Sequence, residues 1–219
     1  MKFRDRVDAG NILAERLSKG PLPNSRNKSK IIVLGIPRGG IIIADILATK
    51  LSADLDVVIG RKLGTPENPE IAIGAIMEDG TTYLNDYLIK ALTISEDYLE
   101  REKAVQIAEI ERRTALYRVK RGYRLRNRIV ILTDDGIATG ATIIAAARWI
   151  RKHSPDFLMI AVPVAPPQTV EILRQEVNAV VVILSPEGLT SVGQFYENFQ
   201  AISDEEVREI LTKRNHMQR

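Results

Sequence analysis

The sequence contains no cysteine and only two histidines, His153 and His216, among its 219 residues. The absence of cysteine excludes disulfide bonds, zinc sites built on thiolates and cysteine nucleophiles. Two histidines are too few for a histidine metal cluster. Because disulfides are characteristic of oxidising compartments, a chain without cysteine fits a reducing cytoplasm, and we expect a cytoplasmic protein.

Long apolar runs are also missing. No stretch approaches the ~18 consecutive apolar residues that span a bilayer, and the N-terminal MKFRDRVDAG lacks the apolar part of a secretory signal. We therefore expect no association with membranes. Aromatic residues are scarce at 5%, but hydrophobic residues make up 45% and charged residues 27%, which excludes a wholly disordered chain.

The excess of positive charge is small. Lys and Arg number 31 and Asp and Glu number 28, which leaves a net charge of +3 at pH 7. This excess is too small to indicate a nucleic-acid-binding surface, although local basic patches could bind phosphates. The length fits a single domain over residues 1–219, and folding can bury roughly 70% of the unfolded chain's surface at this size.

Strands and helices are expected to alternate along most of the chain. Strands are predicted where β-branched and apolar residues run continuously, because such runs are typical of parallel sheets covered on both faces. The alternation predicts an α/β fold with a doubly wound, mostly parallel sheet flanked by helices. The expected strands are 31–36, 55–60, 71–77, 81–84, 129–133, 157–164 and 180–184, and the expected helices are 5–18, 41–51, 95–118, 141–152, 169–176 and a last one from Ser203.

The strongest chemical signal follows a buried strand in the second half of the chain. Residues 130–142 read VILTDDGIATGAT, so that two adjacent carboxylates, Asp134 and Asp135, precede small and hydroxylated residues that lead into a helix. Carboxylates suit a vicinal diol, such as ribose hydroxyls, or a hydrated cation. Residues 138–142 offer backbone N–H groups, two threonine hydroxyls and a helix N-terminus, which favour a phosphate. The string predicts a ribose 5-phosphate site, with simple helix capping as the alternative.

A second candidate loop, Gly35 to Gly40 with the sequence GIPRGG, follows the first strand of the predicted sheet. Its glycines allow the backbone to approach a ligand closely, and Arg38 supplies a forked donor for phosphate oxygens. In an open α/β sheet, ligands bind beyond the carboxyl ends of the strands, where the strand order reverses. The two loops could face each other there, although GIPRGG alone fits an ordinary strand-to-helix turn equally well.

Together, the two loops resemble the type I phosphoribosyltransferase family. Residues 130–142 are similar to that family's motif for 5-phosphoribosyl 1-pyrophosphate (PRPP), and residues 35–40 are similar to its pyrophosphate loop. The resemblance extends over essentially the whole chain, because the expected strands, hairpin and C-terminal segment fall where the family has them. Gly136 is a departure, since the family usually has an aliphatic residue there, and we expect this glycine to loosen the loop.

The resemblance implies a role for each residue of these loops. Asp134 and Asp135 would hold the ribose 2- and 3-hydroxyls and are the candidate catalytic residues. The 5-phosphate would be cradled by five consecutive residues, Ala138, Thr139, Gly140, Ala141 and Thr142. Pyrophosphate would be contacted by residues at the ends of two strands, Arg38, Gly39, Arg61 and Lys62. The family also often has a strained cis peptide in the pyrophosphate loop, which would fall near Pro37-Arg38.

The implied activity is the transfer of ribose 5-phosphate from PRPP to a nitrogenous base or related amine, with release of pyrophosphate, in nucleotide metabolism. Mg²⁺, carried by PRPP without direct protein ligands, and cationic side chains would stabilise the departing pyrophosphate. No protein nucleophile is needed, in agreement with the absent cysteine. One alternative is a non-catalytic regulator that binds PRPP or a nucleotide, and another is Mg²⁺-dependent phosphate-ester chemistry at the acidic pair.

The resemblance also suggests roles for three other segments. The family closes a mobile loop over its site, and residues 64–80, which include the Asp79-Gly80 hairpin signal, are our candidate for that lid, with a passive surface hairpin as the alternative. The helical insertion 86–124 is longer than the family core requires. Its basic end is expected to be a solvated face, and the alternatives are a site for RNA or a nucleotide and a homo-oligomer contact. The hood that binds the base is assigned to 185–219 with the N-terminal segment. There, Tyr196 would stack on the base, unless it only pins this segment to the core.

Overall fold

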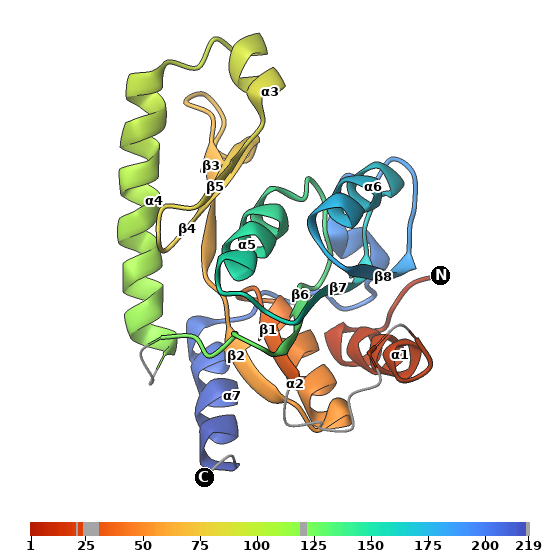
Figure 1. Ribbon diagram of the computed structural model, residues 1–219. Coiled ribbons are helices and arrows are strands. Elements are labelled where there is room, and N and C mark those ends of the chain that lie inside the picture. Colours follow the sequence, from red (N-terminus) through yellow and green to blue (C-terminus); the bar gives the residue numbers. More distant parts are fainter. Residues whose placement is uncertain (21, 24–30, 119–121, 218–219) are drawn as a thin grey trace.

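The structure is a computed structural model that describes residues 1–20, 22–23, 31–118 and 122–217. Its main sheet has the strand order β2-β1-β6-β7-β8, and every neighbouring pair is parallel, as the sequence predicts. An antiparallel sheet of order β3-β4-β5, here the small sheet, lies beside it (Figure 1). The strands are β1 (Ile31–Gly35), β2 (Asp54–Val57), β3 (Gly60–Gly64), β4 (Ala72–Met77), β5 (Thr82–Leu84), β6 (Ile129–Thr133), β7 (Phe157–Val164) and β8 (Ala179–Leu184).

Helices cover both faces of the main sheet (Figure 1). α1 and α2 pack on one face, where α7 adjoins α2, and α5 and α6 pack on the other. α5 also contacts the small sheet, which α3 and α4 border on its outer side. The helices are α1 (Arg6–Ser18), α2 (Gly40–Leu51), α3 (Asp86–Ala91), α4 (Glu96–Tyr117), α5 (Ala141–Lys152), α6 (Pro167–Glu176) and α7 (Asp204–Met217), with a 3₁₀ turn, η2 (Val192–Phe195).

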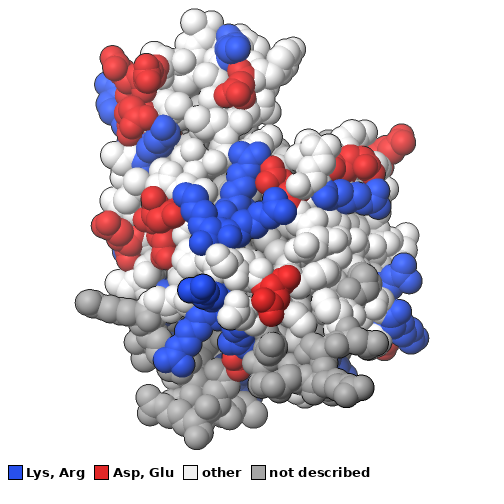
Figure 2. Space-filling model, viewed as in Figure 1, with Lys and Arg blue, Asp and Glu red and all other residues white. Residues whose placement is uncertain are grey.

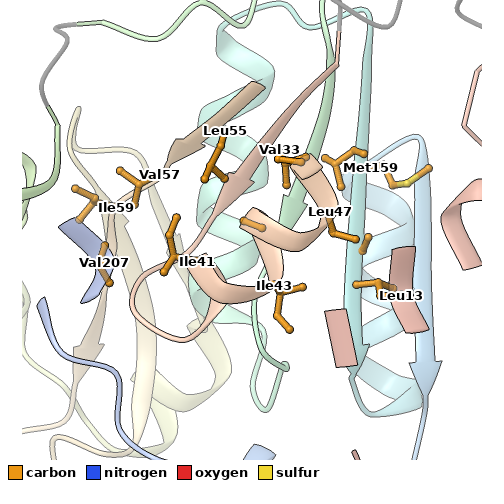
Figure 3. Close-up of a cluster of buried hydrophobic side chains, with 14 of the residues drawn as sticks. Leu13, Val33, Ile41, Ile43, Leu47, Leu55, Val57, Ile59, Met159 and Val207 are labelled. Atoms are coloured by element: carbon orange, nitrogen blue, oxygen red, sulfur yellow. The ribbon is translucent and has the colours of Figure 1, made fainter. Parts of the chain in front are cut away.

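The apolar runs of β1 and β6 are buried along their whole length. Because side chains alternate along a strand, Val33 and Ile131 belong to the cluster under α1 and α2, whereas Leu34 and Leu132 belong to the cluster under α5. Figure 3 shows the first cluster, in which Val33 lies beside Leu47 of α2. Each such aliphatic side chain stabilises the fold by roughly 1.5–3 kcal/mol. The two central strands therefore form a rigid base for the loops that follow them.

The structure corrects two expectations about the region after α2. The strand expected over 55–60 is divided, because β2 ends at Val57 and β3 begins at Gly60 in a different sheet. The candidate lid 64–80 contains β4, which is buried throughout because its apolar residues pack between α4 and α5. Residues 66–71 form an exposed loop there, and Asp79 and Gly80 are exposed at the hairpin turn. The predicted hairpin is confirmed, since Gly80 N–H donates to the carbonyl of Met77 at the turn.

The long charged helix predicted over 95–118 is confirmed as α4. Its N-cap is Ser95, whose hydroxyl accepts a 3.2 Å hydrogen bond from the amide of Tyr98. Leu99, Ile110 and Tyr117 are its buried residues. The basic stretch that follows includes residues 119–121, which lie outside the described residues. One side of α4 packs on the small sheet, its C-terminal half also contacts α7, and much of its remaining surface is exposed, so α4 is a partly solvated helix beside the main sheet (Figure 1).

The surface agrees with the small net charge. On the face shown in Figure 2, Lys and Arg side chains gather near the centre, but acidic side chains interrupt the basic areas around them. Among the described residues, no helix combines the length and the apolar character that a membrane crossing requires.

Candidate functional site

The two predicted loops lie together at the carboxyl ends of β1 and β6, which are neighbouring strands. After β1 the chain turns to α2 on one face of the sheet, and after β6 it turns to α5 on the other. The loops therefore diverge and leave a crevice at this point of the sheet. They also touch, because a Cβ atom at Gly40 would lie 2.8 Å from the Cα of Asp134. The juxtaposition expected from the sequence is present.

The loop after β6 forms one wall of a cavity of about 220 Å³. α5 begins at Ala141, with Gly140 as its N-cap in a left-handed conformation (φ 82°) and without a side-chain cap. The amides of its first turn therefore point toward the cavity with the positive end of the helix dipole. This is the electrostatic environment that a phosphate requires. The cavity is lined by Lys62, Asp134, Asp135, Gly136, Ile137, Ala138, Thr139, Gly140, Ala141, Thr142, Ile143 and Val192.

The two carboxyl groups at the base of this cavity are half-buried and adjacent. One oxygen of Asp134 accepts a 2.8 Å hydrogen bond from the amide of Asp135. Burial, and next the charge of Asp135, raise the pKa of Asp134 well above its usual range. Burial also raises the pKa of Asp135, against the opposing effect of a nearby arginine, Arg6. Two such groups favour a ligand that brings hydroxyl donors or a cation close to them.

Arg6, at the start of α1, escaped the sequence analysis. Its Nε donates to Oδ2 of Asp135 over 2.8 Å, although the two residues are 129 positions apart in the chain. The signal that could have identified it is periodicity. Arg6 shares the buried stripe of α1 with Leu13 and Leu17, and an arginine on an apolar stripe requires a buried partner.

Gly136 does not loosen the loop, contrary to our expectation. A Cβ atom there would lie 2.5 Å from Cγ1 of Val192 and 2.7 Å from Cγ1 of Val164. Val192, from the C-terminal segment, occupies the space that a side chain at position 136 would need. The glycine therefore permits close packing of the C-terminal segment on the loop after β6.

The substitution Gly136→Val is expected to lower the free energy of unfolding by about 1–3 kcal/mol, because overpacking forces its neighbours apart. Adding Val192→Ala should recover part of this loss, since it removes the nearer of the two clashing side chains. Thermal unfolding of both variants and of the single Val192→Ala variant measures the effect. A Gly136→Val protein with wild-type stability would show that Val192 and Val164 can move to accommodate the side chain without loss of free energy of unfolding.

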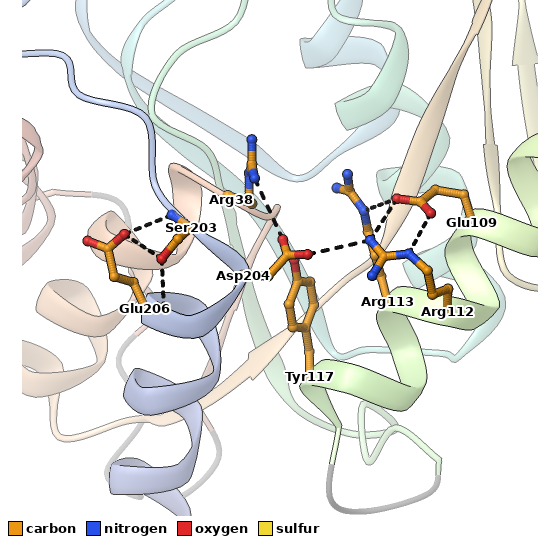
Figure 4. Close-up of polar contacts among 8 residues, drawn as sticks. All are labelled: Arg38, Glu109, Arg112, Arg113, Tyr117, Ser203, Asp204 and Glu206. Atoms are coloured by element: carbon orange, nitrogen blue, oxygen red, sulfur yellow. Dashed lines mark hydrogen bonds and ion pairs between the residues drawn. The ribbon is translucent and has the colours of Figure 1, made fainter.

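The pyrophosphate loop contains the cis peptide bond expected between Pro37 and Arg38. Arg38 is half-exposed and its Nη1 lies 3.7 Å from Oδ1 of Asp204, at the start of α7 (Figure 4). An exposed ion pair at this distance contributes little to stability, so a phosphate could replace Asp204 as the partner of Arg38 at little cost. Gly39 touches the acidic pair, because a Cβ atom there would lie only 1.8 Å from Oδ2 of Asp135.

Arg61 and Lys62 reach the site from a direction that the sequence did not indicate. Both belong to β3 of the small sheet, and Lys62 lines the cavity beside the loop after β6. With Arg113 of α4, they line an adjoining hollow of about 380 Å³ that also includes Pro37 and Asp134. Arg61 donates a 2.9 Å hydrogen bond to Gln106, and burial lowers its pKa. The small sheet and the insertion helix therefore contribute cations beside the pyrophosphate loop.

An ion-pair network joins α4 to α7 next to Arg38 (Figure 4). Glu109 accepts 2.7 Å hydrogen bonds from both Arg112 and Arg113, which lower its pKa to about 2. Asp204 accepts a hydrogen bond from the hydroxyl of Tyr117 and lies 3.4 Å from Arg112. Sequence analysis did not identify these residues as neighbours of the site, because they come from two helices far apart in the chain.

Tyr196 does not have the open ring that base stacking would require, so this prediction is wrong. The residue is 4% exposed, with its ring next to those of Phe3 and Phe199. Its hydroxyl donates a 2.6 Å hydrogen bond to the carbonyl oxygen of Asp135. The N-terminal segment pairs with this region, since Phe3 N–H donates to the carbonyl of Phe195. Tyr196 therefore packs behind the acidic pair and supports it.

Comparisons with known proteins agree with the resemblance seen in the sequence. The family model described as "Phosphoribosyl transferase domain" matches residues 8–183, a range that includes both loops. A Mycobacterium tuberculosis (strain H37Rv) protein named "Putative phosphoribosyl transferase Rv0571c" is 39% identical over 212 residues, which are 96% of this chain and 46% of that protein. The crystal structure of TT1426 from Thermus thermophilus is similar with 40% identity and a TM-score of 0.78, over 97% of this chain and 99% of that one. The chain spans about half the length of the curated relatives it matches.

Proposed function

The chain belongs to the phosphoribosyl transferase family, and from that premise we propose that it transfers ribose 5-phosphate from PRPP to a nitrogenous base or related amine. One observation carries the proposal. A single crevice combines two carboxylates, an uncapped helix N-terminus and a group of cations, which match the diol, the 5-phosphate and the pyrophosphate of PRPP.

Each part of PRPP has a proposed place. The 5-phosphate lies on the amides and hydroxyls of residues 138–142, and Asp134 and Asp135 accept hydrogen bonds from the ribose hydroxyls. The pyrophosphate lies toward Arg38 and Gly39, with Arg61 and Lys62 beside it in the adjoining hollow.

The reaction breaks the bond between C1 of the ribose and the pyrophosphate oxygen, and the acceptor nitrogen forms the new bond to C1. Positive charge develops on the ribose while negative charge accumulates on the leaving group. Lys62, and Arg38 once it exchanges Asp204 for a phosphate oxygen, would stabilise the leaving group. The carboxylates of Asp134 and Asp135 hold the sugar in place, and their negative charge stabilises the positive charge that develops on the ribose.

The donor set fits a Mg²⁺ ion that arrives with PRPP. Among the described residues, no group of three His, Asp or Glu side chains could hold a metal by itself. Mg²⁺ commonly uses one or two carboxylates together with substrate phosphates, and the adjacent carboxyls of Asp134 and Asp135 favour a nearby cation. When bound, the ion would neutralise charge on the departing pyrophosphate.

Incubation with PRPP and Mg²⁺ is expected to release pyrophosphate in the presence of at least one acceptor from a panel of purines, pyrimidines and nicotinates. Calorimetry with PRPP alone measures binding separately from transfer. Binding without release across the panel would favour the second candidate, a regulator that binds PRPP. The burial of Tyr196 is the observation that favours this candidate, because it removes the aromatic ring expected to stack on a base. A protein that does not bind PRPP would contradict both candidates.

A further inference from the structure

Arg6 is buried at a position where burial is costly for its charge. Its exposed fraction is 8%, and it lies on the apolar side of α1 with Ala9 and Leu13. A guanidinium group is rarely removed from water unless charged and polar groups surround it. The contacts of Arg6 therefore indicate why the chain retains an arginine here.

Two contacts from the C-terminal segment hold the guanidinium of Arg6 in one orientation. Its Nη1 donates a 2.8 Å hydrogen bond to the carbonyl of Gln200, and its Cζ lies 3.9 Å from the centre of the Phe199 ring. Its Nε then donates to Oδ2 of Asp135 over 2.8 Å. The C-terminal segment thus fixes the orientation of the guanidinium, which is directed at Oδ2 of Asp135.

Asp135 is restrained from three parts of the chain. Arg6 binds its carboxylate, and the hydroxyl of Tyr196 binds its carbonyl oxygen over 2.6 Å. Gly39 of the pyrophosphate loop leaves the space into which its Oδ2 projects. The N-terminal helix, the C-terminal segment and the pyrophosphate loop all meet at this residue.

We propose that Arg6 is a positioning residue for the ribose-binding site, which holds the carboxylate of Asp135 in one orientation and in its ionised form. This inference rests on the proposed function, because it assigns Asp135 to the ribose hydroxyls. Arg6 does not line the cavity, so it acts through Asp135 and not on PRPP itself. The ribose site is therefore completed by the first helix, outside the residues 130–142 that carry the motif.

The opposing interpretation is that Arg6 only ties the N-terminus to the C-terminal segment. A purely structural arginine would affect stability but not the pH dependence of PRPP binding. A positioning arginine would affect both, because a carboxyl that loses its cation binds a proton at higher pH. The other titratable groups that face the pair are Asp134, Tyr196 and Glu206, and all three remain when Arg6 is replaced.

The test compares Arg6→Gln, Arg6→Lys and the control Arg4→Gln in calorimetric titrations with PRPP and Mg²⁺ between pH 5 and 8. Arg4 lies near the same end of α1 and pairs with Asp8 at an exposed position away from the cavity. We expect Arg6→Gln to weaken PRPP binding about 10-fold at neutral pH, because a hydrogen-bonded charge is lost. Its loss of affinity on acidification should begin at higher pH than in the wild type. Arg6→Lys should restore part of both properties, and Arg4→Gln should change neither.

Three results would overturn the inference. Wild-type affinity in Arg6→Gln is the first. The second is weaker binding with an unchanged pH profile and no recovery in Arg6→Lys, which would indicate a structural tie alone. The third concerns a second variant, used if Arg6→Gln does not fold. Phe199→Leu removes the ring that packs on the guanidinium and leaves Asp135 in place, and an unchanged pH profile of PRPP binding in this variant would also overturn the inference. Failure of the wild-type protein to bind PRPP would instead contradict the proposed function.

Discussion

The substitution Asp134→Asn is expected to weaken PRPP binding about 100-fold while the protein remains folded. Each hydrogen bond to an ionised carboxylate contributes about 1.5–3 kcal/mol, and asparagine offers the ribose hydroxyls a weaker, neutral acceptor. The asparagine oxygen can still accept the hydrogen bond from the amide of Asp135 that Asp134 accepts at 2.8 Å. The substitution should therefore lower the affinity for PRPP without changing the conformation of the loop.

The same substitution is expected to stabilise the protein at neutral pH. Burial and the charge of Asp135 raise the pKa of Asp134 in the folded state above the ordinary value of 3.8. The folded protein then holds this proton more tightly than the unfolded chain, so the free energy of unfolding falls as pH rises from that ordinary value through the raised pKa. Asparagine removes this penalty. The gain should be largest at neutral pH and vanish below about pH 4.

Calorimetry with PRPP and thermal unfolding at several pH values measure the two effects on one preparation. Asp156→Asn is the matched control, since Asp156 is an exposed acid at the start of β7, on the opposite edge of the sheet from the site. It removes one negative charge without touching the cavity. An Asp134→Asn protein that binds PRPP as the wild type does would exclude Asp134 from the ribose site.

The substitution Gly39→Ala is expected to reduce both stability and PRPP binding strongly. The backbone of Gly39 is helical, with φ −61° and ψ −36°, so alanine is compatible with its conformation. The added methyl group, however, would lie 1.8 Å from Oδ2 of Asp135 and 2.8 Å from Nε of Arg6. Either the loop moves or the ion pair separates. Separation of a buried pair costs about 3–5 kcal/mol, and the melting temperature should then fall by roughly 10 °C.

PRPP affinity should fall at least 100-fold in Gly39→Ala, because the change displaces the pyrophosphate loop and the ribose carboxylate together. Differential scanning calorimetry and PRPP titration measure the two effects. Lys50→Ala, at an exposed position in the last turn of α2, controls for changes in that helix. A Gly39→Ala protein with wild-type stability and affinity would show that the two loops are not in the contact described.

The sequence predicts the framework of this protein well, because its signals are local. The runs 31–36 and 129–132 consist of aliphatic residues except for Gly35, and such runs become strands buried on both faces. Residues 130–142 carry the acidic pair and the phosphate loop on one continuous segment, so their proximity needs no tertiary information. The predicted strands other than the one over 55–60, the Asp79-Gly80 hairpin and the helix capped by Ser95 are accordingly present, as is the cis peptide at Pro37-Arg38 that the family resemblance implies.

The errors concern contacts between distant segments. Tyr196 is an aromatic residue in the segment that resembles the family's hood, and its phenol tolerates water at one edge, but Phe3, at the other end of the chain, packs against its ring. Residues 64–80 are expected to be a hairpin that closes over the site, because of their glycines, prolines and Asp79-Gly80 turn, yet α4 and α5 bury β4 between them. In both cases, the local pattern does not reveal which distant element will pack on the segment.

Local signals along the chain predict the α/β sheet and the two loops at its centre, since each depends on neighbours a few positions away. The folded chain was needed to show that Arg6 binds Asp135 across 129 positions, that Arg61 and Lys62 reach the site from a separate sheet, and that Val192 fills the space above Gly136. The physical reason is that charge pairing and steric fit depend on distance in space, which the folded chain sets and the order of residues along it does not.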